Sequence, residues 1–488
     1  MNQAIRSSWV VAIALFALVF GSITYVQFFA VDDLKKNANN NRSLIQEFCN
    51  DRGSILVGGQ AIAQSVPTND TCKYQRQYLQ PELYAGLTGF FTQFSGASGI
   101  EAAKSDQLSG NSPDAFYDKI MQVLSGSQPK GRSVELTIDP KIQQLAYDMI
   151  PEGQPGSIVV MNPKTGAIIA MVSKPSYDTN LLAGHNRDAV QANFNRLVNV
   201  PGIDMYGSKA YKGLYAPGSV FKLVDTAAAL ASGKYNKDSV LANPATLSFP
   251  GTDVLLPNYA GGGCSAKTQA DFAFVLEQSC NTPFAQIAMD LGQNAITDQA
   301  TKFGFNDGGL QIPDSVQASQ FPGSKGPLGP ADLARSAIGQ QNVKVTPLEI
   351  AMMTAAIANG GQQMKPNLIK DIRTPDLKPV EELQPEVLRQ STTPEIAAQI
   401  TQWMRDVVDV GIAHAAAVPG VEVAGKTGTA EGNTADPNSK NNAWFTGFAP
   451  ANDPQVVVSI VMSNVDIATG AKLTSPNASK LFKAVLNK

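Results

Sequence analysis

The sequence predicts an α+β protein with a single transmembrane helix, a smaller N-terminal domain and a larger second domain. Three observations support this: an uncharged N-terminal run, apolar β-rich segments at both ends of residues 156–488, and helical patterns between them. Strands that flank a helical middle indicate one antiparallel sheet assembled from both ends of the domain, with helices packed against it. A chain of 488 residues can bury a large core.

The uncharged run is Trp9–Ala30, 22 residues that would span about 33 Å as a helix. A cleaved signal peptide is the alternative, but its apolar run is shorter and ends in a small-x-small site, which Phe28-Phe29-Ala30 does not provide. We therefore expect an uncleaved anchor at 9–30. Residues 1–8 would form a cytoplasmic tail, and everything after Val31 would lie on the outer face of the cell membrane.

Residues 31–155 are expected to form a small, loop-rich domain. Near its end, Ser133–Ile138 alternates in the manner of a strand, and Pro140 opens a helix towards Met149. The net charge of −3 and the charged fraction of 16% argue against a nucleic-acid partner, which usually needs a basic face.

The larger domain, 156–488, opens on two apolar runs joined by a turn, which predict a hairpin of Ser157–Met161 with Ala167–Val172. Three further strands are expected near its C-terminus: Val421–Ala430, Ala443–Phe448 and Val456–Met462. The predicted helices are Val220–Ser232, Asp271–Glu277, Pro283–Leu291, Pro347–Ala358 and a closing helix at Leu481–Leu486.

Three short motifs carry the chemistry, and the first is Ser219-Val-Phe-Lys222. Pro217-Gly218 breaks the chain just before a helical apolar pattern, so Ser219 should lie on the first turn of a helix with Lys222 on the same face. The helix N-terminus would favour an anion formed at the serine. A serine at a helix start is more often a cap than a nucleophile, so this motif is weak alone.

The second motif, Ser279-Cys280-Asn281, falls in a predicted turn between two helices, where capping residues are also common. The third, Lys426-Thr427-Gly428-Thr429, lies inside a strand pattern. Glycines at 425 and 428 would weaken an ordinary strand, and we expect them where a ligand backbone lies close to its edge.

Together the motifs supply a serine with a lysine three residues on, a hydroxyl with an amide, and a second lysine. That set suits acyl transfer without histidine, and the chain has only two histidines. Similar tripeptides elsewhere, such as Lys164-Thr165-Gly166 at a hairpin tip, fail the structural context that each motif needs. We expect no cofactor and no metal.

All four cysteines follow the predicted anchor. Proximity in sequence favours Cys49 with Cys72 and Cys264 with Cys280, both plausible in an oxidising compartment. A bridge at Cys280 would tie the loop that carries Ser279 and Asn281 to the preceding segment. Buried free thiols are the alternative.

Around these motifs the sequence resembles a class B penicillin-binding protein, a membrane-anchored monofunctional peptidoglycan transpeptidase. Ala216-Pro-Gly-Ser-Val-Phe-Lys222 is similar to the active-serine segment of that family, and Val160–Val172 to the opening hairpin of its transpeptidase domain. Arg52-Gly-Ser-Ile-Leu56 resembles the entry to its N-terminal module. The resemblance implies the fold shared with serine β-lactamases, an antiparallel sheet with helices on both faces.

The resemblance also implies site roles. Ser219 would attack the D-Ala-D-Ala stem peptide, a neutral Lys222 would accept its proton, and Ser279 would relay a proton to the leaving nitrogen. Asn281 would hold the substrate amide, while Lys426, Thr427 and Thr429 would bind the terminal carboxylate beside Gly428. β-Lactam antibiotics would acylate Ser219, and a lipid-linked glycan polymerase in the membrane is an expected partner.

Other classes of protein could use the same three motifs. A β-lactamase needs a deacylating base, and no glutamate can be assigned to that role. A D-Ala-D-Ala carboxypeptidase, in which water replaces the acceptor amine, stays open as the main alternative. A non-catalytic β-lactam receptor is disfavoured, because residues 1–8 are too few for a cytoplasmic effector.

Overall fold

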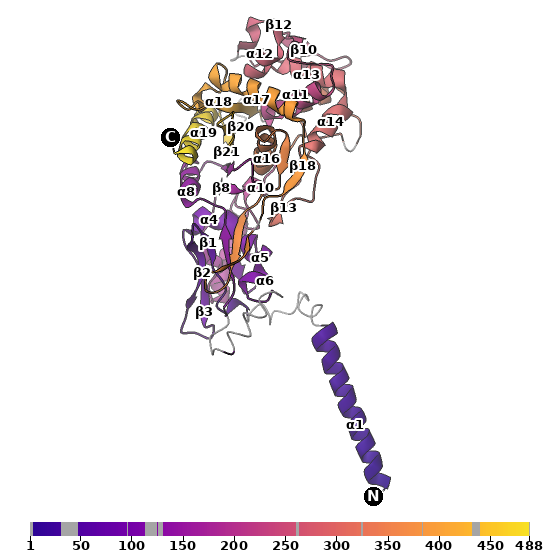
Figure 1. Cartoon of the computed structure of the whole chain (residues 1–488), viewed down its shortest axis with the longest axis vertical. Helices are drawn as coiled ribbons and strands as arrows, with labels where there is room; N and C mark the ends of the chain where they lie inside the picture. The colour runs from indigo at the N-terminus through magenta and orange to yellow at the C-terminus, as the bar shows by residue number, and fades with distance from the viewer. Residues whose placement is uncertain are drawn as a thin grey trace.

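The computed structural model describes residues 3–30, 47–94, 96–112, 124, 130–259, 263–323, 326–382, 384–431 and 440–487. Residues 31–46, at the start of the predicted N-terminal domain, lie outside this description. Figure 1 shows three parts in succession: helix α1 at the bottom, a violet lobe above it, and the larger domain at the top.

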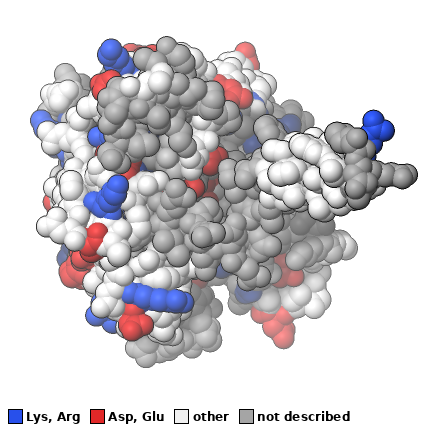
Figure 2. Space-filling view, turned by 90° about the horizontal axis from the view of Figure 1, so that it is seen from below, with Lys and Arg blue, Asp and Glu red and all other residues white. Residues whose placement is uncertain are grey.

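Helix α1 runs from Gln3–Thr24 and continues as a short π-helical turn, η1, Tyr25–Phe29. Among the described residues it is the one helix long and apolar enough to cross a membrane, over Ile5–Thr24. It therefore fits a membrane anchor. It starts earlier than predicted, so most of the expected tail 1–8 is helical. In Figure 2 the helix is an uncharged projection with a basic side chain near its tip, and Arg6 is the one charged residue between positions 3 and 30.

The violet lobe contains a six-stranded sheet in the order β17-β16-β6-β1-β2-β3. Four of its strands come from the N-terminal part of the chain: β1 Ile55–Val57, β2 Gln60–Pro67, β3 Tyr74–Tyr78 and β6 Ser133–Leu136. The other two, β16 Ile369–Arg373 and β17 Pro379–Glu382, reach down from the larger domain, and β16 pairs antiparallel with β6. The sequence did not predict that two strands from the larger domain would complete this sheet.

The larger domain is built on a five-stranded antiparallel sheet in the order β19-β20-β21-β7-β8. Its strands are β7 Gly156–Met161, β8 Ile168–Lys174, β19 Ala424–Ala430, β20 Asn441–Ala449 and β21 Val456–Val465. The prediction of one antiparallel sheet from both ends of the domain is confirmed. Strand β19 starts three residues later than expected.

Helices cover both faces of this sheet. Neighbouring strand residues point to opposite faces, and every residue of β7 is buried. Helix α16, Pro347–Ala358, packs on β7, β20 and β21. Helix α19, Ser475–Leu486, also packs on β20 and β21, and it contacts α8, Pro140–Asp148, which packs on β8. Helix α8 has a local start signal, since Asp139 accepts hydrogen bonds from its first turn ahead of Pro140.

The helical middle of the domain lies at the top of Figure 1. It contains α11 Lys222–Ala231, α12 Phe272–Glu277, α13 Asn281–Leu291, α14 Gln293–Lys302, α15 Pro330–Ala337 and α17 Pro394–Asp409. Helix α17 packs on α11, α12 and the edge strand β19. This places the segments that hold the three sequence motifs next to one another.

Candidate active site

Ser219 lies on a 3-10 turn, η4 Gly218–Phe221, that leads directly into α11. The sequence predicted the first turn of an α-helix; the tighter turn is a common form of helix start. Gly218 has a φ of +55° and donates its N–H to the Gly339 carbonyl at 2.9 Å. A Cβ at position 218 would lie 2.5 Å from the Thr429 carbonyl oxygen, so the turn fits closely against β19.

Lys222 is fully buried, and its Nζ has neutral hydrogen-bond partners. It donates to the Ser279 carbonyl at 2.7 Å and to Asn281 Oδ1 at 2.8 Å, and it lies 3.4 Å from Ser279 Oγ. Burial holds the pKa of Lys222 well below its ordinary value, and the Lys426 cation lowers it further, while Asp225 acts in the opposite direction. The amine therefore favours its uncharged form.

The second motif turns sharply at Ser279, a buried non-glycine residue with a φ of +56°. In this left-handed backbone conformation, both the carbonyl and the hydroxyl of Ser279 lie within hydrogen-bond distance of Lys222 Nζ. The sequence placed Asn281 in the turn, but it is the first residue of helix α13. The intervening Cys280 forms a disulfide with Cys264, and Cys49 forms one with Cys72.

The third motif lies on β19, which among the described strands pairs only with β20. Lys426 is fully buried, and its Nζ donates to Ser279 Oγ at 2.7 Å and to the Thr427 carbonyl at 3.0 Å. Burial lowers the pKa of Lys426 to about 7. Thr427 is half-buried and Thr429 is exposed.

Gly428 lies against the turn that carries Ser219. A Cβ there would lie 2.7 Å from the Pro217 carbonyl oxygen and 2.9 Å from Val220 Cγ2. The absent side chain thus makes room for the turn that carries Ser219. At Gly425, a Cβ would lie 2.7 Å from the Phe445 ring. Both glycines permit close packing within the protein.

The three motifs therefore meet around one hydroxyl group, Ser279 Oγ, which lies within 3.4 Å of both lysine nitrogens. Serine, two lysines with lowered pKa values and an exposed strand edge form a site that can activate a hydroxyl and bind an anion. In the part of the chain that the structure describes, no three His, Cys, Asp or Glu side chains come together as metal ligands.

Sequence reasoning missed Asp225, which is fully buried three residues after Lys222. Neither carboxyl oxygen has a hydrogen-bond partner in the described structure, and burial raises the pKa of this carboxyl well above its ordinary value. An acidic residue inside an otherwise apolar helix pattern, one turn from the lysine, was the available signal.

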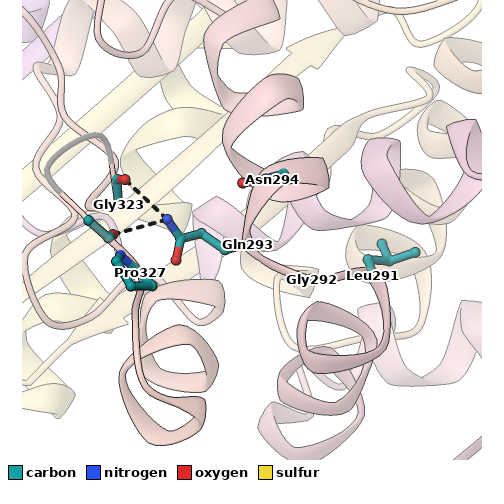
Figure 3. Close-up of a pocket in the computed structure, with 7 residues that line it drawn as sticks. Leu291, Gly292, Gln293, Asn294, Gly323 and Pro327 are labelled. Atoms are coloured by element: carbon teal, nitrogen blue, oxygen red, sulfur yellow. Dashed lines mark hydrogen bonds between the residues drawn. The ribbon is translucent and has the colours of Figure 1, made fainter.

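A surface pocket lies between the end of α13 and the start of α14 (Figure 3). Gln293 points across it and donates to the carbonyl oxygens of Gly323 at 3.1 Å and Gly326 at 3.2 Å. None of the residues that line the pocket belongs to the three motifs, so we assign it no part in the chemistry.

Comparison with known proteins agrees with this geometry. Residues 156–487 match the penicillin binding protein transpeptidase domain, and residues 52–134 match the penicillin binding protein A dimerisation domain. The chain belongs to the penicillin-binding protein family. This penicillin-binding protein is 35% identical to the peptidoglycan D,D-transpeptidase PbpA of Mycobacterium tuberculosis H37Rv, over 100% of this chain and 99% of that one. It is also 35% identical to the PbpA of Mycolicibacterium smegmatis, with the same coverage.

Solved structures give the same relationship. This penicillin-binding protein resembles the imipenem acyl-enzyme complex of penicillin-binding protein A from M. tuberculosis with a TM-score of 0.84 at 34% identity, covering 90% of this chain and 99% of that one. The penicillin G acyl-enzyme complex of the same protein matches with a TM-score of 0.83 at 35% identity, covering 90% and 100% of the two chains.

Proposed function

We propose that this penicillin-binding protein is a serine D,D-transpeptidase that cross-links peptidoglycan stem peptides and is acylated by β-lactams. The observation that carries the proposal is the position of Ser279 Oγ, 2.7 Å from Lys426 Nζ and 3.4 Å from Lys222 Nζ, with the strand of Lys426 packed against the turn that carries Ser219. The 35% identity to peptidoglycan D,D-transpeptidases over the full chain supports the same reaction.

In the first step, Ser219 Oγ attacks the carbonyl of the penultimate D-Ala, and Lys222 accepts the hydroxyl proton. A neutral amine has two N–H donors and one lone pair. The Ser279 carbonyl and Asn281 Oδ1 occupy both donors of Lys222. The lone pair then has only Ser279 Oγ, at 3.4 Å, as a described hydrogen-bonding neighbour and can take a proton, which is the property that a general base needs.

The proton next moves to the leaving group. Ser279 lies between the two lysines and can pass a proton from Lys222 to the departing D-Ala nitrogen as the carbon–nitrogen bond breaks. The backbone N–H groups of Ser219 and Thr429 would form the oxyanion hole. The amine of a neighbouring stem peptide then attacks the acyl-enzyme carbonyl and forms the new amide; it gives up one proton through Lys222 to Ser219 Oγ as the ester bond breaks.

Lys426, Thr427 and Thr429 would bind the terminal carboxylate of the donor stem along the edge of β19. An approaching carboxylate raises the pKa of a neighbouring amine. Lys426, whose pKa burial has lowered to about 7, would therefore become charged when its ligand binds.

The chain organisation follows from this assignment. Helix α1 would anchor the enzyme with its N-terminus in the cytoplasm and the catalytic domain, 156–488, on the outer face of the cell membrane. Residues 31–155 would form a non-catalytic pedestal, and a lipid-linked glycan polymerase would be the partner in the membrane. An oxidising compartment is consistent with the two disulfides.

Labelling with a fluorescent penicillin tests the nucleophile. Wild-type protein should acquire one covalent label that is lost in Ser219→Ala and kept in the control Ser232→Ala, at the far end of the same helix. Labelling that survives Ser219→Ala would remove the proposed nucleophile. Turnover with paired stem peptides then separates cross-linking from hydrolysis, which would be the outcome for a carboxypeptidase.

The Cys264–Cys280 bridge should hold the second motif in place. Replacing both of these cysteines by serine should slow penicillin acylation more than the same change at Cys49 and Cys72, because only the first bridge is attached to the loop of Ser279. Equal losses for the two double variants would contradict this role. Mapping of non-reduced peptides checks that both bridges form.

A further inference from the structure

Helix α13 begins at Asn281 without a cap from its own N-cap residue. That residue is Cys280, whose sulfur is bonded to Cys264 and which makes no side-chain capping bond. The first N–H groups of a helix have no partner within the helix and need one from outside. The catalytic asparagine thus depends on another part of the chain to fix its backbone.

Asn258 supplies that partner from outside the motif. It follows the short hairpin of β10, Thr246–Ser248, and β11, Leu255–Pro257. Its Oδ1 accepts the backbone N–H of Asn281 at 2.7 Å and that of Thr282 at 3.0 Å. One amide oxygen therefore satisfies two of the free donors at the start of α13.

Asn258, which is half-buried, is itself held by the buried Asn243. Its Nδ2 donates to Asn243 Oδ1 at 2.7 Å and to the Pro244 carbonyl at 3.1 Å. Asn243 in turn donates to the carbonyls of Cys264 at 2.8 Å and Lys267 at 2.7 Å. The network fixes which end of the Asn258 amide faces α13, because only the oxygen can accept from the helix N–H groups.

The same hairpin also holds the side chain of Asn281. Its Nδ2 donates to the Pro257 carbonyl at 3.1 Å, which leaves Oδ1 facing Lys222 Nζ at 2.8 Å. If the Asn281 amide were reversed, its N–H would donate to the lysine lone pair and block the proton acceptor. Orientation of this amide therefore decides whether Lys222 can act as a base.

We propose that Asn258 is a positioning residue of the transpeptidase reaction, which caps α13 in place of Cys280 and thereby fixes Asn281 against Lys222. The inference rests on the proposed function, since it assigns Lys222 the part of base. Asn258 touches no reacting atom; it acts through the residue next to the base. Loss of the Asn258 cap should therefore change the pH at which Lys222 gains a proton, as well as the rate of acylation.

The experiment measures the second-order rate of acylation by a fluorescent penicillin across pH, with full-length protein in detergent. Lys222 is surrounded by two charged or titratable groups, Lys426 on β19 and Asp225 on its own helix, and neither is altered. In Asn258→Ala, the plateau rate should fall at least tenfold. The pH midpoint of the acidic limb should move lower, because a misplaced Asn281 no longer accepts from the lysine ammonium.

Two variants separate positioning from simple stability. Asn186→Ala removes another asparagine cap, which accepts from Ala189 N at the start of α9, Arg187–Val198; it should lower the melting temperature without changing rate or midpoint. Asn258→Asp keeps an acceptor for both helix N–H groups but loses the donor to Asn243 and Pro244, so it should return the rate only part of the way towards wild type. Asn258→Ala with a lowered melting temperature but an unchanged rate and midpoint would overturn the proposal.

If Asn258→Ala does not fold, Asn258→Gln carries the test. It keeps the amide but displaces its oxygen by one methylene from the N–H groups of Asn281 and Thr282. We expect a smaller fall in rate with the same direction of midpoint shift, and an unchanged profile would overturn the proposal. Wild-type protein that acquires no label at Ser219 would instead refute the proposed function, so the two failures are distinguishable.

Discussion

Replacing Asp225 with asparagine should make the stability of the catalytic domain less sensitive to pH. Asp225 is fully buried, and in the described structure neither of its carboxyl oxygens has a hydrogen-bond partner. Burial raises the pKa of this carboxyl well above 3.8, and the opposing effect of Lys222 is smaller. Asparagine has nearly the same shape and does not ionise.

The size of the effect follows from proton linkage. Below the ordinary pKa of 3.8 both folded and unfolded chains hold the proton, and the free energy of unfolding does not depend on this group. Above it, the unfolded chain releases the proton while the folded protein keeps it. The free energy of unfolding then falls by about 1.4 kcal/mol for each pH unit, until Asp225 ionises in the folded protein too.

The asparagine variant lacks this slope. Its own buried amide costs about 1–3 kcal/mol if unpaired, but that penalty is the same at every pH. The difference in unfolding free energy between variant and wild type should therefore shift in favour of the variant by up to about 1.4 kcal/mol per pH unit above about pH 4. The prediction therefore concerns how this difference in unfolding free energy changes with pH, and not whether the variant is more or less stable at any one pH.

Urea unfolding at a series of pH values measures this slope. The buried Trp403 and Trp444 both lie in the catalytic domain and report its unfolding by fluorescence. Asp298→Asn, on the exposed face of α14, is the matched control and should track wild type. If the curves for Asp225→Asn and wild type run parallel from about pH 4 to 7, burial does not keep Asp225 protonated and the reasoning is wrong.

Two further predictions concern the site. The rate of penicillin acylation should fall at low pH as Lys222 gains a proton, and again above about pH 7 as Lys426, with its pKa of about 7, loses the charge that binds the carboxylate; a flat stopped-flow profile would contradict both assignments. Gly218→Ala should abolish acylation, because its Cβ would lie 2.5 Å from the Thr429 carbonyl oxygen. Gly233 also has a positive φ, but a Cβ there would meet nothing within 4 Å, so Gly233→Ala should lose only about 1–2 kcal/mol of stability and label normally.

The strands of the central sheet were predictable because their signals are local. β7 and β21 are continuous apolar runs bounded by turns, and they have the burial on both faces that such runs indicate. The hairpin of β16 and β17 was not predictable in the same way. All four residues of β17 are exposed, and β16 finds its partner β6 more than two hundred residues earlier in the chain, so neither carries a local sign of where it pairs.

The features of the site can likewise be divided into those that the sequence predicted and those that it did not. Each motif was recognisable from residue types and spacing, and the structure brings Lys222, Ser279 and Lys426 together. What holds the motifs was hidden, because it depends on contacts between distant segments. Gly428 lies against the Pro217 carbonyl, and Asn258, after a separate hairpin, accepts a hydrogen bond from Asn281 N. The spacing of these residues in the sequence predicts neither contact.

The pairing of two buried lysines gives the site a property that a single lysine would lack. Burial lowers the pKa of both amines, and the charge of Lys426 lowers that of Lys222 further. A ligand carboxylate beside Lys426 would raise the pKa of that amine and fix its charge. The carboxylate also offsets the Lys426 charge that acts on Lys222, so its binding should raise the pKa of Lys222 as well. Such coupling is reciprocal: protonation of Lys222 should strengthen carboxylate binding, which a Lys222→Met variant, lacking the second cation, should show as a less pH-dependent affinity below pH 7.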